Sequence, residues 1–169
     1  FGLDTNQEVI KKCDELNILL KGEINIKNFS EDFDLIVICS PLSTYKDIFK
    51  DLNEYVTKPT LVTDVGSTKV SVIEDFTQNT NNKNLKFLPA HPIAGLEKSG
   101  PEYGFAKLFE NRYCIVTPIN NDRTFNNQII DMWKSLGMKI ETMDPERHDR
   151  VLAMTSHIPQ LIAYSVVAT

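Results

Sequence analysis

A histidine followed by a run of flexible and polar residues is the part of this sequence best suited to chemistry. The run reads His91-Pro92-Ile93-Ala94-Gly95-Leu96-Glu97-Lys98-Ser99-Gly100. Pro92 and Gly95 oppose a continuing strand or helix, so His91 is predicted on a loop. Residues 85–90 look like a short buried strand, and loops beyond the carboxyl ends of such strands in α/β sheets bind ligands. An imidazole at this position can transfer protons near neutral pH.

A second polar turn, Asp64-Val65-Gly66-Ser67-Thr68-Lys69, lies between a strand predicted over 60–63 and a helix predicted from Val70 to about Phe76. Gly66 permits a left-handed turn or a close backbone approach. Ser67 is predicted at the same sheet edge as His91. Its alternative role is the N-cap of the following helix, and the two roles are compatible.

An acidic residue, Asp4, follows a strand predicted over 1–3 and precedes a helix predicted over 6–16. At the end of the second strand of a dinucleotide-binding fold, a carboxylate accepts the ribose hydroxyls of NAD and repels the extra phosphate of NADP. The alternative is a plain helix cap, and the sequence leaves both roles open.

Two further histidines lie on a helix that starts at Asp144-Pro145-Glu146, a strong N-terminal signal. Pro159 is predicted to kink this helix. His148 and His157 are nine residues apart, which places them on opposite faces of a straight helix, so they are not expected to share one pocket. His157 is either a packing residue or a pocket residue, and His148 is interpreted as a packing residue.

The remaining elements set the fold class. Strands are predicted over 35–39, 113–117 and 139–143 and helices over 45–55 and 125–136, with Ser43 and Thr44 as caps of the first of these helices. This alternation predicts an α/β, Rossmann-like, doubly wound and mostly parallel sheet, followed by the start of a helical domain. The predicted division is an α/β domain over 1–143, followed by the start of a helical domain over 144–169.

Composition excludes several classes of protein. The 169 residues carry 18 basic and 23 acidic side chains, a net charge of −5 without a basic patch, which argues against nucleic acid as a partner. No apolar run approaches the ~20 residues of a membrane span, and no signal peptide opens the chain. Three scattered cysteines fit a reducing compartment, so a cytoplasmic protein is expected. No metal site is predicted.

With these pieces in place, the sequence resembles the prephenate and arogenate dehydrogenase family of tyrosine biosynthesis. The resemblance covers nearly the whole chain. The motifs that carry it are Asp4, Ser40-Pro41, residues 64–69, the run 91–100, Thr117-Pro118, His148-Asp149 and Ser156-His157-Ile158-Pro159.

The resemblance implies NAD-dependent oxidative decarboxylation of prephenate to 4-hydroxyphenylpyruvate. It implies that His91 hydrogen-bonds the ring hydroxyl of the substrate and that Ser67 orients His91. It also implies substrate contacts at Glu97, Ser99, Gly100 and His157, and cofactor contacts at Asp4, Ser40, Pro41, Thr44 and Ser67. Where the family often has a second histidine three residues after His157, this chain has Gln160.

The resemblance also indicates an internal segment of a longer homodimeric protein. The Gly-rich phosphate turn and first strand are expected before Phe1, and the main dimerisation region and a carboxylate-binding arginine after Thr169. Without that central strand the segment is expected to be inactive and to fold poorly or aggregate. Lys69, Lys98, Arg112 and Arg150 remain as candidates to meet an anion, although solvated or structural roles are favoured.

Several alternatives stay open. The substrate can be arogenate, giving tyrosine, and a fused chorismate mutase is compatible with the sequence. A β-hydroxyacid dehydrogenase would need a catalytic lysine on a later helix, and none lies between 144 and 169. A non-catalytic NAD-binding regulatory module would bind the cofactor without turnover.

Overall fold

The strands of the computed structural model, which describes residues 1–30, 32–96 and 98–167, form three small sheets. The central one is parallel and has the order β3 (Leu35–Ile38), β4 (Thr60–Asp64), β5 (Leu85–Leu88). Beside it, β7 (Tyr113–Val116) pairs antiparallel with β6 (Ala90–Pro92) and parallel with β8 (Lys139–Thr142). The third is the short parallel pair β1 (Gly2–Leu3) and β2 (Gly22–Glu23).

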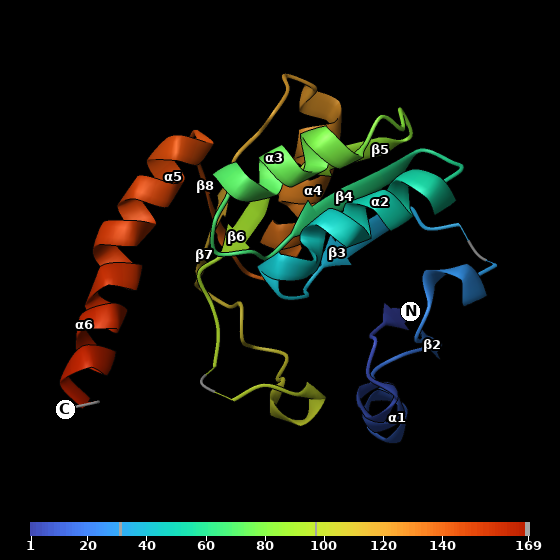
Figure 1. The fold of residues 1–169 in the computed structure, drawn as a ribbon, viewed down its shortest axis with the longest axis horizontal. Coiled ribbons are helices and arrows are strands. Elements are labelled where there is room, and N and C mark those ends of the chain that lie inside the picture. Colours follow the sequence, from blue (N-terminus) through green and yellow to red (C-terminus); the bar gives the residue numbers. More distant parts are fainter. Residues whose placement is uncertain (31, 97, 168–169) are drawn as a thin grey trace.

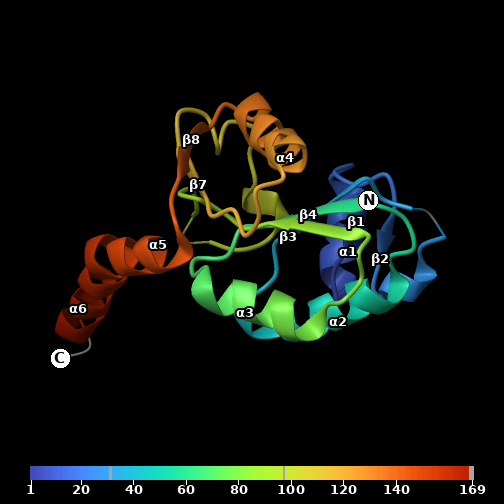
Figure 2. The ribbon, with the colours of Figure 1, turned by 90° about the horizontal axis from the view of Figure 1, so that it is seen from above.

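Helices cover both faces of the central sheet. Figure 2 shows α2 (Tyr45–Tyr55) and α3 (Val70–Asn79) below it and α4 (Arg123–Ser135) above it. The chain also forms α1 (Gln7–Glu15) and the short 3₁₀ turns Ile26–Asn28, Leu42–Thr44 and Pro101–Tyr103. This arrangement confirms the predicted doubly wound α/β fold.

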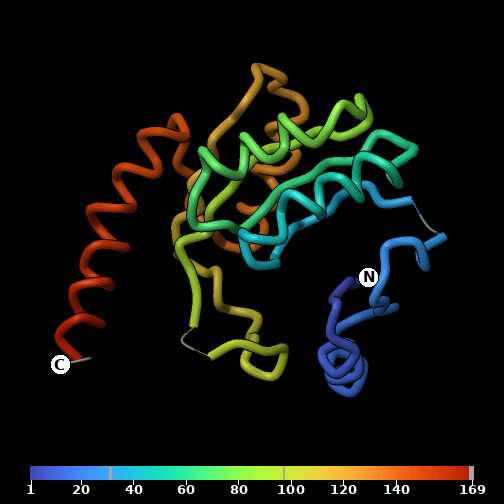
Figure 3. Tube along the Cα trace, in the orientation of Figure 1, coloured from blue at the N-terminus to red at the C-terminus, as the bar shows by residue number. Residues whose placement is uncertain are grey.

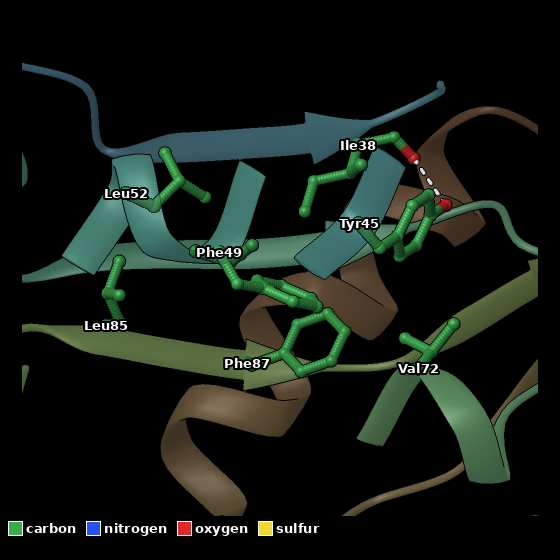
Figure 4. Close-up of a cluster of buried hydrophobic side chains, with 8 residues drawn as sticks. Ile38, Tyr45, Phe49, Leu52, Val72, Leu85 and Phe87 are labelled. Atoms are coloured by element: carbon green, nitrogen blue, oxygen red, sulfur yellow. Dashed lines mark hydrogen bonds between the residues drawn. The ribbon is translucent and has the colours of Figure 1, made fainter. Parts of the chain in front are cut away.

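Each face of the sheet has its own hydrophobic core. On the α2 and α3 side, aromatic rings pack edge to face around Phe49, which contacts Tyr45 and Phe87 (Figure 4). Phe49 also contacts the ring of Phe76. The Tyr45 hydroxyl donates a hydrogen bond to the Ile38 carbonyl. Each fully buried side chain of this size stabilises the fold by ~1.5–3 kcal/mol. The α4 side is built around Trp133 and Ile129, as the helical spacing predicts.

The outer edge of β3 carries no strand partner among the described residues. A groove of about 540 Å³ separates this edge from β1 and is lined by residues of both strands and by Asp4 and Ser40, which lie just after them. Figure 1 shows β1 and β2 lying apart from β3, and Val37 of β3 is 38% exposed. An open strand edge of this kind is a site for pairing with another segment.

The C-terminal helices leave the body of the molecule as one rod, visible in Figures 1 and 3. α5 (Pro145–Leu152) and α6 (Ile158–Val167) are joined by a π-helical turn, Ala153–His157. The kink predicted at Pro159 takes the form of this π-helical turn, in which the backbone hydrogen bonds span one residue more than in an α-helix. The helical rod changes direction at the turn (Figure 2). Among the described residues, no helix combines the length and apolarity needed to cross a membrane.

One local prediction is wrong. His91 does not lie on a loop but is the middle residue of β6, opposite Ile115 of β7. Proline is tolerated in an edge strand such as β6, so the strand ends at Pro92, two residues later than predicted. Pro89 separates β5 from β6, which allows the chain to change from parallel to antiparallel pairing.

Candidate active site

The His91 ring lines a pocket of about 340 Å³ at the end of the sheet. The ring is half-buried, and its Nε2 atom has no hydrogen-bond partner in the part of the chain that the structure describes. The other lining residues come from four segments: Pro92 to Gly95, Leu108, Arg112, and the helical residues Leu152 and Ser156. Arg112 brings a cation to this pocket, whose other polar side chains are His91 and Ser156.

The inner nitrogen of His91 belongs to a chain of hydrogen bonds that the sequence does not suggest. His91 Nδ1 lies 2.9 Å from His148 Nε2, and His148 Nδ1 lies 2.7 Å from Asp149 Oδ1. The carboxylate of Asp149 also accepts hydrogen bonds from the backbone N–H groups of Lys69 (2.7 Å) and Val70 (3.0 Å), at the start of α3. A side chain of α5 therefore caps α3 and holds His148 against His91.

A buried ion pair fixes the residue before His91. Lys69 Nζ donates to Asp64 Oδ2 and to the Ala90 carbonyl, and Asp64 Oδ1 accepts from the Ala90 N–H at 2.9 Å. Both charged side chains are fully buried. The N–H and C=O groups of Ala90 are both held in this way. Asp64, at the end of β4, and Lys69, at the start of α3, therefore fix the position of His91 in β6. Of the cations proposed to meet an anion, Lys69 is therefore structural.

The surroundings of His91 keep its ring neutral. The pKa of His91 is lowered to about 4, chiefly because the ring is buried. His148, Lys69 and His157 lower this pKa further, and Asp149 raises it without offsetting the other effects. A neutral imidazole with a free nitrogen facing a pocket is a general base.

This shift can be measured directly. Titration of His91 by NMR is expected to give a midpoint near pH 4, because the folded protein disfavours the imidazolium. The unfolded chain, with an ordinary pKa of ~6.5, then binds more protons between these two values, so stability should rise with pH across that window. The resonance is assigned by its loss in His91→Gln, and a midpoint near 6.5 would contradict the arrangement.

The predicted cofactor residues line the groove beside β3 or lie close to it. Asp4 and Ser40 both line it, whereas Pro41 and Thr44 are exposed in the turn before α2. Asp4 Oδ1 accepts a hydrogen bond from the Asn6 N–H, and Asn6 itself caps α1. The Ser40 hydroxyl is buried without a hydrogen-bond partner among the described residues. An acidic side chain and an unsatisfied hydroxyl on one groove fit a polar ligand such as a nucleotide.

The side-chain caps predicted for α2 and α3, Ser43, Thr44 and Ser67, do not form. Thr44 donates its hydroxyl to the Pro41 carbonyl instead of capping α2, because a 3₁₀ turn already supplies partners to that helix. Ser67 lies in the turn between β4 and α3, and its side chain hydrogen-bonds neither the helix nor His91 within the described ranges. Asp149 takes the capping role predicted for Ser67.

The predicted substrate residues are placed unevenly. His157, in the π turn, is close enough to influence the charge of His91. Ser99 and Gly100 are exposed on the segment after β6, and Gly100 adopts a left-handed backbone with φ 120°. Glu97 lies outside the described residues. No cluster of metal-ligating side chains occurs in residues 1–30, 32–96 and 98–167.

Two family models match the chain. Residues 1–142 match the nucleotide-binding domain of prephenate dehydrogenase, and residues 144–169 match its dimerization domain.

Individual relatives agree with this assignment. The chain is 33% identical to a cyclohexadienyl dehydrogenase of Zymomonas mobilis over 97% of its own length and 56% of the relative's. It is 32% identical to a prephenate dehydrogenase of Bacillus subtilis over 99% of its length and 45% of the relative's. The chain thus spans about half the length of these curated relatives.

A solved structure extends the likeness to three dimensions. The prephenate dehydrogenase of Aquifex aeolicus, in complex with hydroxyphenyl propionate and NAD+, superposes with a TM-score of 0.89 at 33% identity. The match covers 99% of this chain and 58% of that one. Matching models across both parts of the chain, a shared fold and the His91 pocket lead to one conclusion: this chain belongs to the prephenate dehydrogenase family.

Proposed function

We propose that the full-length protein oxidises and decarboxylates prephenate to 4-hydroxyphenylpyruvate with NAD as hydride acceptor. The observation that carries this proposal is the neutral, half-buried His91, which lines the pocket and whose Nε2 has no hydrogen-bond partner among the described residues. The substrate hydroxyl lies against this nitrogen. In this reading Arg112, at the rim of the same pocket, attracts the substrate carboxylates.

The role of His91 follows from the charges that the reaction moves. NAD, when bound, would supply the acceptor for the hydride that leaves the ring carbon bearing the hydroxyl. His91 Nε2 accepts the hydroxyl proton as the carbon–oxygen double bond forms, so that no full positive charge builds on that carbon. The bond to the ring carboxylate then breaks and carbon dioxide leaves. Its electrons make the ring aromatic, and the proton held on His91 returns to the oxygen, which becomes a phenol.

The groove beside β3 is the proposed NAD site. Asp4 at its rim would accept the ribose hydroxyls and disfavour NADP, and the buried Ser40 hydroxyl would gain a partner there. Pro41, Thr44 and Ser67 complete the proposed cofactor contacts. Ser67 remains the proposed orienting group, and His157, Ser99, Gly100 and Glu97 the proposed substrate contacts.

The proposed domain division places residues 1–143 in the dinucleotide-binding domain and 144–169 at the start of the dimerisation domain. α6 supports this division because apolar side chains on it are exposed: Ile158, Leu161, Ile162, Tyr164, Val166 and Val167. A helix with such a surface is expected to be covered by further helices or by a second subunit. We propose a cytoplasmic homodimer.

The test is to follow NADH formation by the full-length protein with prephenate and with arogenate. Turnover with prephenate is expected, with release of carbon dioxide in equal amount. Preference for arogenate would keep the chemistry and change the substrate. NAD binding without turnover on either substrate would instead support a regulatory module and end the proposal.

A further inference from the structure

We propose that Asp149 and His148 are positioning residues that fix the tautomer of His91, so that the lone pair of His91 is on Nε2 and faces the pocket. This inference rests on the proposed function for its kinetic consequence. The tautomer itself is a property of the free protein and can be tested without turnover.

The chain of hydrogen bonds starts from an anion. Burial would raise the pKa of Asp149, but hydrogen bonds from His148 and from the backbone N–H groups of Val70 and Lys69 outweigh it and hold the pKa below its usual value. Two backbone donors at a helix start favour a negative charge. Asp149 is therefore an ionised acceptor, fixed in place by α3.

An ionised acceptor determines the tautomer of its neighbour. Because Asp149 Oδ1 has no proton to give, His148 Nδ1 must carry the hydrogen in the 2.7 Å contact. His148 is completely buried, and this burial lowers its pKa despite the nearby carboxylate. A neutral ring with hydrogen on Nδ1 has a lone pair on Nε2.

The same logic passes to His91. The Nε2 lone pair of His148 accepts a hydrogen bond at 2.9 Å, so His91 Nδ1 is the donor. The neutral His91 ring then presents its lone pair on Nε2, which has no partner among the described residues. With the opposite tautomer, His91 Nε2–H would face the substrate hydroxyl and could not accept its proton.

This arrangement also serves the protonated state. When Nε2 takes a proton, Nδ1–H still donates to His148, and the ionised Asp149 lies beyond it. The other charged groups that act on His91 are Lys69, beside the start of α3, and His157, in the π turn; both oppose its protonation, whereas Asp149 favours it. No proton needs to leave His91 until the product oxygen takes it back.

The decisive variant is Asp149→Asn. With its amide oxygen at the place of Oδ2, the asparagine still accepts from the Val70 N–H, and its NH₂ group at the place of Oδ1 donates to His148 Nδ1 and reverses every donor and acceptor up to His91. The Lys69 N–H then loses its acceptor, so a lower melting temperature is expected as well. We expect kcat to fall by about 10²–10⁴-fold, as for other reversed histidine tautomers. KM and NAD affinity should change little. The matched control is Asp144→Asn. Asp144 caps the start of α5, the helix that carries Asp149, and its replacement by asparagine should leave kcat unchanged.

A second pair of variants covers the case in which Asp149→Asn fails to fold. In His148→Gln, the amide oxygen can accept from His91 and the amide NH₂ can donate to Asp149, so the tautomer is kept. His148→Leu removes both contacts. We expect the glutamine variant to retain kcat within about tenfold and the leucine variant to lose most of it. Equal losses in the two variants would point to packing alone and overturn the proposal.

The direct readout is ¹⁵N NMR of the histidine rings in the unliganded protein. We expect His91 with an unprotonated Nε2 in the wild type and a protonated Nε2 in Asp149→Asn. Protonated Nε2 in the wild type overturns the inference whatever the enzyme does. A protein that lacks turnover but shows the expected tautomer contradicts the proposed function and leaves the positioning intact.

Discussion

Replacement of His91 by alanine in the full-length protein is expected to lower kcat by about 10²–10⁴-fold while NAD affinity stays at the wild-type value. Loss of a general base has an effect of this size. NAD binding should survive, because the groove lined by Asp4 and Ser40 does not include His91. Stopped-flow or steady-state measurement of NADH formation with prephenate gives kcat. Titration with NAD, followed by protein fluorescence, gives the affinity for NAD.

Chemical rescue provides the control for this variant. His91→Ala leaves a gap beside the pocket of about 340 Å³, which is open to small molecules. Added imidazole should therefore restore part of the turnover, with a dependence on pH that follows the imidazole base. Unchanged turnover in His91→Ala would remove this residue from the mechanism. A loss without rescue, together with a lower melting temperature, would indicate a structural role.

The fold was predictable because its signals are local. The unalternating run Leu35 to Ile38 indicates a parallel strand, which β3 is, although only Ile38 of this edge strand is buried. Asp144-Pro145 marks the start of α5, where Asp144 Oδ1 accepts from the Arg147 N–H. His91 was identified from its neighbours in sequence, although its backbone was misassigned. Strand pairing with β7 is a contact between distant segments, and the proline next to His91 concealed it.

The hydrogen-bond partners of His91 were not predictable in the same way. The straight-helix argument predicted that His148 and His157 do not share a pocket, and neither lines the pocket of His91. It did not anticipate the hydrogen bond between His148 and His91, nor the π turn Ala153–His157, which shifts every later residue around the helix axis. Both histidines act on His91. The adjacent pair His148-Asp149 was the available signal: an acid beside a histidine on a helix that begins at the sheet edge.

The capping of α3 shows a second limit of sequence reasoning. Ser67 has the right residue type and position for an N-cap, but Asp149, 80 residues beyond Lys69, takes that role. Local propensity cannot anticipate a cap supplied by another element. The same applies to the Asp64–Lys69 pair, since an aspartate and a lysine five residues apart in a polar turn are normally solvated, and here the turn is buried under β6.

Replacement of Lys69 by methionine is expected to reduce the free energy of unfolding by about 3–5 kcal/mol, the cost of leaving a buried charge without its partner. Asp64 would keep its backbone donors, Gly66 and Ala90, but would lose the ammonium group. Removing the ammonium also raises the pKa of Asp64 further, because Lys69 opposes the effect of burial. The reduction in the free energy of unfolding caused by Lys69→Met should therefore become smaller as pH falls and Asp64 becomes protonated. Urea unfolding at several pH values measures this change.

Two further variants separate charge from packing in this prediction. Lys50→Met removes a lysine whose pair with Asp47 is exposed, and should cost no more than ~1 kcal/mol. Asp64→Asn combined with Lys69→Met removes both buried charges, while the amide oxygen of the asparagine can still accept from a backbone N–H. The double variant should be more stable than Lys69→Met alone at neutral pH, because no unpaired charge remains. If the double variant were as unstable as Lys69→Met, the lost hydrogen bond from Lys69 to the Ala90 carbonyl, and not the ion pair, would be what holds β6 in place.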